Sequence, residues 1–165
     1  MWIVLRTDDH NVFTTALLNK DKAQLEGDTY NFANLTRVFV TNIIATELIK
    51  AFSESDIKFK PVAIEFETPD IEDVDIKRKV TSLINCVNKQ LSIDIETAEH
   101  LYDHLTEDYN VDFCCISFVN TETDYFTFDL YADGSIEFDE DNMTVGDMQK
   151  ALQFIIDVIE KGNLL

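Results

Sequence analysis

The sequence of 165 residues predicts an α+β fold: a mixed or antiparallel sheet of about four to six strands, packed against three or four helices. Short segments with period-two alternation are typical of half-buried strands, and longer segments with apolar residues every three or four positions are typical of amphipathic helices. The two kinds of segment follow each other in mixed order. No linker rich in Pro, Gly or Ser divides them, so a single domain over residues 1–165 is expected.

The first third of the chain is predicted to contain a strand, an element of undecided type and a helix. Residues 2–6 are predicted to be a strand. Residues 12–18 fit either a second strand or a short helix, and residues 24–32 are irregular or a strand. Asn34 is predicted to cap a helix that runs to about Phe52 and has a broad apolar face.

The middle of the chain is predicted to form a strand followed by two helices. Residues 61–67 alternate apolar and polar side chains, which indicates a half-buried strand. A helix with an apolar face over residues 76–91 follows. A second helix, capped by Ser92 or Asp94, is expected to end before Tyr109.

The last third is predicted to form a hairpin and a final helix. Residues 111–119 are apolar on both parities, which is typical of a central strand covered on both faces, and residues 125–131 alternate with their aromatic residues inward. Asp133 and Gly134 are expected to close a hairpin, because such a pair tolerates the positive φ of a tight turn. A helix with a capping box at its start and a glycine at its end is predicted over residues 144–162.

The charge of the chain is large and unevenly distributed. The formal net charge is -19, of which residues 1–60 contribute -1 and residues 61–165 contribute -18. The run over residues 90–149 contains sixteen Asp and Glu and neither Lys nor Arg. A hydrophobic fraction of 45% is ordinary for a globular protein, so the acidic part is expected to be the surface of a folded domain.

The chain lacks the sequence signatures of several enzyme classes. Its four glycines are widely spaced, so it has no P-loop and no dinucleotide-binding fingerprint, and no Gly-x-Ser-x-Gly elbow occurs. We therefore expect a non-enzymatic protein without a cofactor. Thirteen Lys and Arg against thirty-two Asp and Glu would repel phosphates, so direct binding of nucleic acid is not expected.

Other features of the sequence favour the cytoplasm. No apolar run reaches the roughly 18 residues of a membrane span, and the first residues lack the basic start of a secretory signal, so no membrane partner is expected. The cysteines are Cys86, Cys114 and Cys115. An odd number with an adjacent pair favours reduced structural thiols over disulfides or a metal site.

Exposed charge of one sign indicates a partner of the opposite sign. We expect the acidic part to recognise a basic protein that itself binds nucleic acid, because the composition is similar to that of DNA-mimicking inhibitors and of immunity proteins that neutralise nucleases. A surface that only maintains solubility, or adaptation to high salt, would also explain the charge. Tyrosines among the acids are candidate contact residues: Tyr102, Tyr109, Tyr125 and Tyr131. The candidate partner-binding carboxylates are Asp103, Glu107, Asp108, Asp112, Asp124, Asp129, Glu137, Asp139, Glu140 and Asp141.

The alternative function is a small metal-binding protein or metal-dependent enzyme. His100, Asp103 and His104 place two imidazoles four residues apart on a helix, similar to the zinc motif His-x-x-Glu-His but with Asp in place of Glu. Residues 129–140 match several ligand positions of a calcium-binding EF-hand loop. Tyr131 occupies a ligand position there, and a strand precedes the loop where an EF-hand needs a helix. A hairpin and solvated histidines are the simpler interpretations.

Overall fold

The computed structural model describes residues 1–9, 11–16, 29–30 and 35–162. These residues form an eight-stranded sheet and four helices, which confirms the predicted α+β class; the sheet exceeds four to six strands because it includes two short strands, β3 and β4. The strands are β1 (Trp2–Thr7), β2 (Val12–Ala16), β3 (Thr29–Tyr30), β4 (Leu35–Arg37), β5 (Phe59–Glu67), β6 (Asp112–Asn120), β7 (Phe126–Tyr131) and β8 (Ser135–Phe138). The helices are α2 (Asn42–Glu54), α3 (Val74–Gln90), α4 (Ile95–Tyr109) and α5 (Val145–Lys161).

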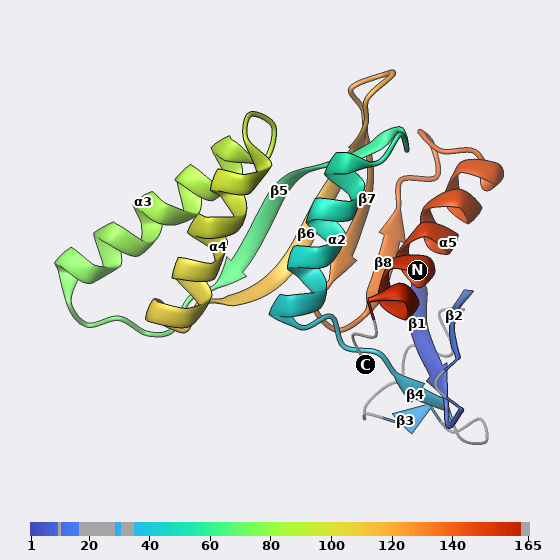
Figure 1. The fold of residues 1–165 in the computed structure, drawn as a ribbon, viewed down its shortest axis with the longest axis horizontal. Coiled ribbons are helices and arrows are strands. Elements are labelled where there is room, and N and C mark those ends of the chain that lie inside the picture. The colour runs from blue at the N-terminus through green and yellow to red at the C-terminus, as the bar shows by residue number, and fades with distance from the viewer. Residues whose placement is uncertain (10, 17–28, 31–34, 163–165) are drawn as a thin grey trace.

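The strands pair in the order β3-β4-β1-β8-β7-β6-β5, and β2 pairs with β1 outside this path. Every pairing is antiparallel. The N-terminal strand β1 therefore lies beside β8, and β5 lies beside β6 although two helices separate them in the sequence (Figure 1). Segments that are distant in the sequence thus share one continuous sheet.

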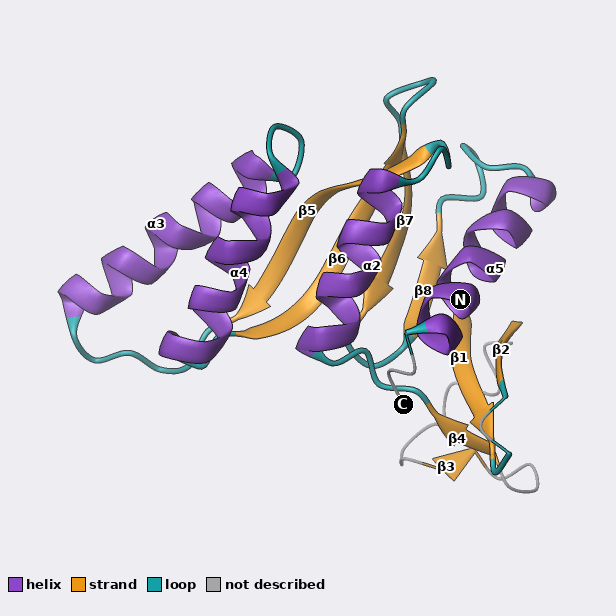
Figure 2. Cartoon of the chain, in the orientation of Figure 1, coloured by secondary structure: helices purple, strands orange, loops and turns teal. Residues whose placement is uncertain are grey.

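The helices pack on one face of this sheet (Figure 2). Phe52 of α2 contacts Phe118 of β6 and Phe154 of α5, with ring centroids 4.6 Å apart in both pairs. Phe66 of β5 contacts Tyr102 of α4 at 5.6 Å between centroids. The main core therefore lies between the helices and one side of the strands, and each strand turns its alternate residues to the other side.

The hairpin predicted at Asp133 and Gly134 is confirmed. Strands β7 and β8 are joined by a three-residue loop in which Gly134 has a φ of 79°. A Cβ at this position would lie 2.0 Å from the backbone oxygen of Val38, so only glycine fits. Arg37 of β4 forms an ion pair of 2.7 Å with Asp133, which links the β7–β8 loop to β4, two strands away from β8 in the sheet.

The helix predicted from Asn34 to Phe52 begins later than expected. Helix α2 begins at Asn42, with the hydroxyl of Thr41 as its N-cap acceptor, and Asn34 lies outside the described residues. Residues 35–37 form β4, which pairs with β1. Pairing with a strand that is remote in the sequence overrides the helical periodicity of this segment.

The other predicted elements are confirmed with small shifts at their ends. The predicted strands at residues 2–6 and 61–67 are β1 and β5, and the three later helices are α3, α4 and α5. Asp94, not Ser92, caps α4. Strand β2 lies in residues 12–18, which fitted either a strand or a short helix, and β3 lies in residues 24–32, which were expected to be irregular or a strand. The predictions for residues 17–28 and 31–32 lie outside the described part of the chain.

Three irregularities in strand pairing change the expected alternation. The pairing of β5 with β6 skips Val62 on β5 and Cys114 on β6, and the pairing of β6 with β7 skips Thr127. Such bulges shift the direction of the side chains that follow or precede them. Val62 and Phe126, both expected to point inward, are 36% and 40% exposed as a result.

Among the helices of the described residues, none is both long and apolar enough to cross a membrane.

Candidate interaction surface

The described helices leave one face of the sheet uncovered, and the strand register shows which side chains lie on that face. Ile64, Ile116, Leu130 and Ile136 lie in one row across β5, β6, β7 and β8, and all are buried in the main core. Their sequence neighbours point to the opposite face. The residues that point away from the helices therefore lie side by side, and most of them are polar. They are Glu65, Cys115 and Tyr131 in one row, Ala63, Ser117, Asp129 and Glu137 in the next, and the pair Glu67 and Asp112 at the strand ends.

We call the five carboxylates of these positions, with Ser117 and Tyr131 between them, the acidic sheet face. The carboxylates come from four strands: Glu65, Glu67, Asp112, Asp129 and Glu137. Four of them are exposed and Asp129 is half-buried. None of the register positions in these rows carries Lys or Arg, so the face has a single sign of charge.

Asp129 and Glu137 are directly opposite each other on β7 and β8. Directly opposite residues have Cβ atoms about 5 Å apart, and like charges at such positions destabilise a sheet. The Ser117 hydroxyl donates a hydrogen bond of 2.6 Å to Asp129 Oδ1. No ion pair among the described residues neutralises Glu65, Asp129 or Glu137.

Burial and the negative charge of these carboxylates both raise the pKa of the two titratable groups between them, Tyr131 and Cys115. Burial, followed by the charges of Asp129, Glu137 and Glu65, raises the pKa of the half-buried Tyr131 to about 12. Burial, with Asp129 and Glu65 as further causes, raises the pKa of the Cys115 thiol far above its usual range. Cys115 is 3% exposed, so this thiol is protonated and unreactive at neutral pH, as expected for a structural cysteine.

The acidic sheet face ends where β8 meets β1. Ile3 and Leu5 point away from the main core and form a second small apolar cluster with Met1 and Leu35. Both are almost fully buried, and Ile3 is opposite Ser135, which is 6% exposed. Residues 111–119 were expected to be covered on both faces. The described helices cover only one face of β6, so this expectation is wrong for the other face.

Exposed aromatic residues border the same face at the start of β7. Phe126 is opposite Val119 of β6 and is 40% exposed, and the preceding Tyr125 is 60% exposed. Of the other candidate tyrosines, Tyr102 is buried in the main core and donates a hydrogen bond to Asn42. Tyr125 and Tyr131 are thus the predicted aromatic contacts that reach the surface on this side.

The ten predicted partner-binding carboxylates lie in four places. Asp103, Glu107 and Asp108 are exposed on α4, and Asp124 is in the turn between β6 and β7. Asp139, Glu140 and Asp141 follow β8, where Asp139 accepts hydrogen bonds from Asn142 and from the backbone of Asp141. Asp112, Asp129 and Glu137 belong to the acidic sheet face. The structure thus brings three of the ten together with Glu65 and Glu67, which are not among the predicted carboxylates.

In the described structure, these ten carboxylates are all without a Lys or Arg partner. Within the described part of the chain, none of them forms an ion pair with Lys or Arg, and Asp108 contacts only a histidine. Other acids of the same cation-free run do form such pairs. Asp133 pairs with Arg37 at 2.7 Å and Asp147 with Lys58 at 2.9 Å. The chain therefore neutralises some of its acids and leaves this set unpaired.

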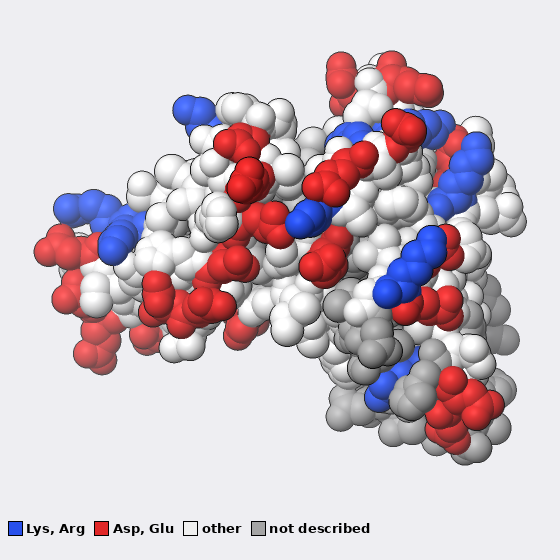
Figure 3. All heavy atoms as spheres, viewed as in Figure 1, with Lys and Arg blue, Asp and Glu red and all other residues white. Residues whose placement is uncertain are grey.

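The helical side of the molecule has mixed charge. Figure 3 shows Lys and Arg beside Asp and Glu over this side, with the acids closest together near the start of α3 and the end of α4. A groove of about 490 Å³ lies between α2 and α4. It is lined by Lys50, Glu54, Ile95, Glu96, Glu99, His100 and Asp103.

The predicted metal ligands do not gather into a metal site. His100 is exposed in the α2–α4 groove, whereas the ring of His104 contacts Asp108 and packs edge-on against Tyr109. Among the residues with a described position, no group of three or more His, Cys, Asp or Glu has a geometry that would hold a metal ion. Residues 129–140 form the β7–β8 hairpin and the segment after it, not a helix-flanked loop.

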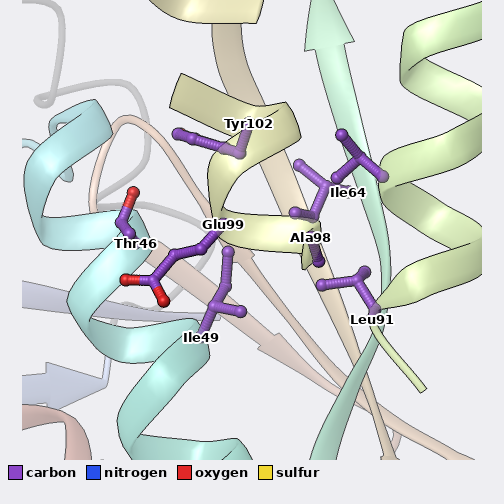
Figure 4. Close-up of a pocket in the computed structure, with 8 residues that line it drawn as sticks. Thr46, Ile49, Ile64, Leu91, Ala98, Glu99 and Tyr102 are labelled. Carbon is purple, nitrogen blue, oxygen red and sulfur yellow. The ribbon is translucent and has the colours of Figure 1, made fainter. Parts of the chain in front are cut away.

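The junction of α2, α3, α4 and β5 contains a small cavity (Figure 4). Its volume of about 10 Å³ is room for about one water molecule. Its walls are mainly apolar, with Thr46 and Glu99 as the polar exceptions. The lining residues are Thr46, Ile49, Ile64, Val87, Leu91, Ala98, Glu99 and Tyr102. This cavity is a packing gap and offers no space for a substrate.

Comparison of the chain with protein-family models, with curated proteins and with solved structures finds no match.

Proposed function

We propose that the protein is a non-enzymatic acidic module that binds a basic protein, and that this partner is itself a nucleic-acid-binding protein which the module antagonises. The observation that carries the proposal is the acidic sheet face. Five carboxylates from four strands lie there, no helix of the described residues covers them, and Asp129 is directly opposite Glu137. Charge in this arrangement lowers stability when the protein is alone and is neutralised when a cationic surface covers it.

The fixed positions of the carboxylates on neighbouring strands, more than their exact spacing, favour a partner that normally binds phosphates. Neighbouring strands are about 4.8 Å apart, and alternate residues of one strand are about 6.8 Å apart. Glu65 and Glu67 repeat along β5 in this way, while Asp129 and Glu137 repeat across β7 and β8. Duplex DNA presents about one negative charge per 1.7 Å of axis, so a basic groove that fits phosphates also attracts a rigid array of carboxylates.

Solubility alone is the competing explanation, and a charge-matched pair of variants separates the two. The first variant, E65Q/D129N/E137Q, neutralises the acidic sheet face. The second, E47Q/E54Q/E96Q, removes the same charge from exposed positions on α2 and α4. If the charge serves only solubility, the two variants behave alike.

The test is capture of proteins from a nuclease-treated lysate on the immobilised wild-type chain and on both variants. We expect the wild type and the α2/α4 variant to retain a basic nucleic-acid-binding protein, with an affinity that falls steeply between about 50 and 300 mM salt. The acidic-face variant should lose it, and nucleic acid added back should displace it from the wild type. Equal retention by both variants, or retained proteins that are not basic, would contradict the proposal.

A further inference from the structure

We infer that the acidic sheet face is a docking surface for arginine side chains of the partner, in preference to lysine, with Tyr131 as the aromatic platform. The inference rests on the proposed function, since it specifies which cation of a basic partner the face selects. It starts from the position of a half-buried aromatic ring inside a set of unpaired carboxylates.

Tyr131 is surrounded by carboxylates from three strands. Asp129 is two residues earlier on β7 and therefore points to the same side, and Glu137 is the diagonal neighbour on β8. Glu65 is in the same row as Tyr131, with Cys115 of β6 between them. The ring is thus part of the surface, and negative charge lies on three sides of it.

Arginine fits this arrangement better than lysine does. A guanidinium is planar, so it can stack on an aromatic ring while its N–H groups bind a carboxylate in a bidentate manner. An ammonium is a compact and strongly hydrated point charge, which gains the Coulomb attraction but little from the ring. Asp129 uses Oδ1 for the Ser117 hydroxyl, and Glu137 has no hydrogen-bond partner among the described side chains. Both carboxylates therefore keep oxygens that can accept from a guanidinium.

The test compares two peptides of equal length and charge, one of arginine-glycine-serine repeats and one of lysine-glycine-serine repeats. Fluorescence anisotropy at low salt measures their affinity for the wild-type chain and its variants. We expect the arginine peptide to bind about threefold to tenfold more tightly, the range of one stacked guanidinium. Tyr131→Leu should abolish this preference and leave the affinity for the lysine peptide unchanged, whereas Tyr131→Phe, which keeps the ring, should retain it.

Controls make failure of this inference distinguishable from failure of the proposed function. The variant E65Q/D129N/E137Q should lose both peptides; if it loses neither, the acidic sheet face is not the cation-binding surface and the proposed function fails as well. If it loses both but the wild type does not prefer arginine, or Tyr131→Leu keeps the preference, only the arginine inference is overturned. Tyr109→Leu, on α4, is the matched aromatic control and should change neither affinity.

An NMR measurement on the wild type keeps the inference testable should Tyr131→Leu fold poorly. Addition of the arginine peptide should shift the backbone amide signals of Tyr131 and of its row neighbours in β5 and β6. Signals of the α2–α4 groove should stay in place. Shifts centred on that groove would place the arginine site elsewhere and overturn the assignment.

Discussion

Removal of one charge from the acidic sheet face should make the protein more stable. Glu137→Gln keeps the shape of the side chain and removes its repulsion with Asp129, directly opposite on β7. Two unit charges about 6 Å apart repel by about 0.7 kcal/mol in water and about 2.8 kcal/mol at an effective dielectric constant of 20. Glu137 is exposed, which favours the lower figure, and measured cross-strand pairs span about 0.2–1 kcal/mol. We expect a gain of about 0.5–1 kcal/mol in the free energy of unfolding.

Thermal and urea unfolding at neutral pH and low salt would measure this gain. For a chain of this size, a gain of about 0.5–1 kcal/mol raises Tm by about 1–4 °C. Glu47→Gln on α2 is the control, because it changes the net charge equally at an exposed helical site. The difference between the two variants should shrink in 1 M salt, where the Debye length is about 3 Å. The reasoning fails if Glu137→Gln is no more stable than Glu47→Gln, or if salt leaves the difference unchanged.

Three further predictions concern the positions that hold the sheet and helices together. Gly134→Ala should lower the free energy of unfolding, measured by urea titration, by at least about 2 kcal/mol, since φ is positive and the new Cβ meets a backbone oxygen. Gly146→Ala is the control, because the new Cβ has no atom nearer than 3.8 Å, and it should be neutral or slightly stabilising in the same titration. Lys60→Met should lower the free energy of unfolding by about 1–3 kcal/mol, because Nζ donates hydrogen bonds to three carbonyls at the end of α2. Circular dichroism should show a loss of total helix content. Unchanged helix content with unchanged stability would refute this. The hydrogen bond from Lys58 lowers the pKa of Asp147, so its stabilisation is present above the unfolded value near 3.8 and is lost as pH falls through the folded pKa. The stability difference between wild type and Asp147→Asn should therefore shrink between pH 5 and pH 3, and a constant difference across that range would contradict the assignment.

Local patterns in the sequence predicted most of the helices and strands, because the interactions that begin and end these elements are local. Thr144 as the cap of α5, Asp94 as a possible cap of α4 and the glycine of the β7–β8 loop act within a few residues of themselves. The predicted start of α2 was wrong because the interaction that determines it involves residues remote in the sequence. Residues 35–37 pair with β1, about thirty positions earlier, and nothing in their own periodicity indicates this.

The candidate surface was predictable only in part, for the same reason. Alternation in β5 and β7 already places Glu65 and Asp129 on the polar side of their strands. It does not indicate that β5 lies beside β6, so the row that joins Glu65 to Tyr131 depends on a pairing across two intervening helices. The position of Phe126 depends on a bulge, which alternation does not reveal.

The distribution of cations argues that the acidic sheet face is more than a means of staying in solution. A net charge of magnitude about 2–8 keeps a small domain soluble, and this chain carries -19. Some of its cations are placed beside acids elsewhere, as Lys58 is beside Asp147 and Arg37 beside Asp133. A single Lys at position 137, opposite Asp129, would turn a repulsive cross-strand pair into an attractive one and still leave the chain strongly acidic. A solubility requirement is met equally well by that arrangement, so it does not explain the opposed carboxylates, whereas the proposed cationic partner would neutralise them.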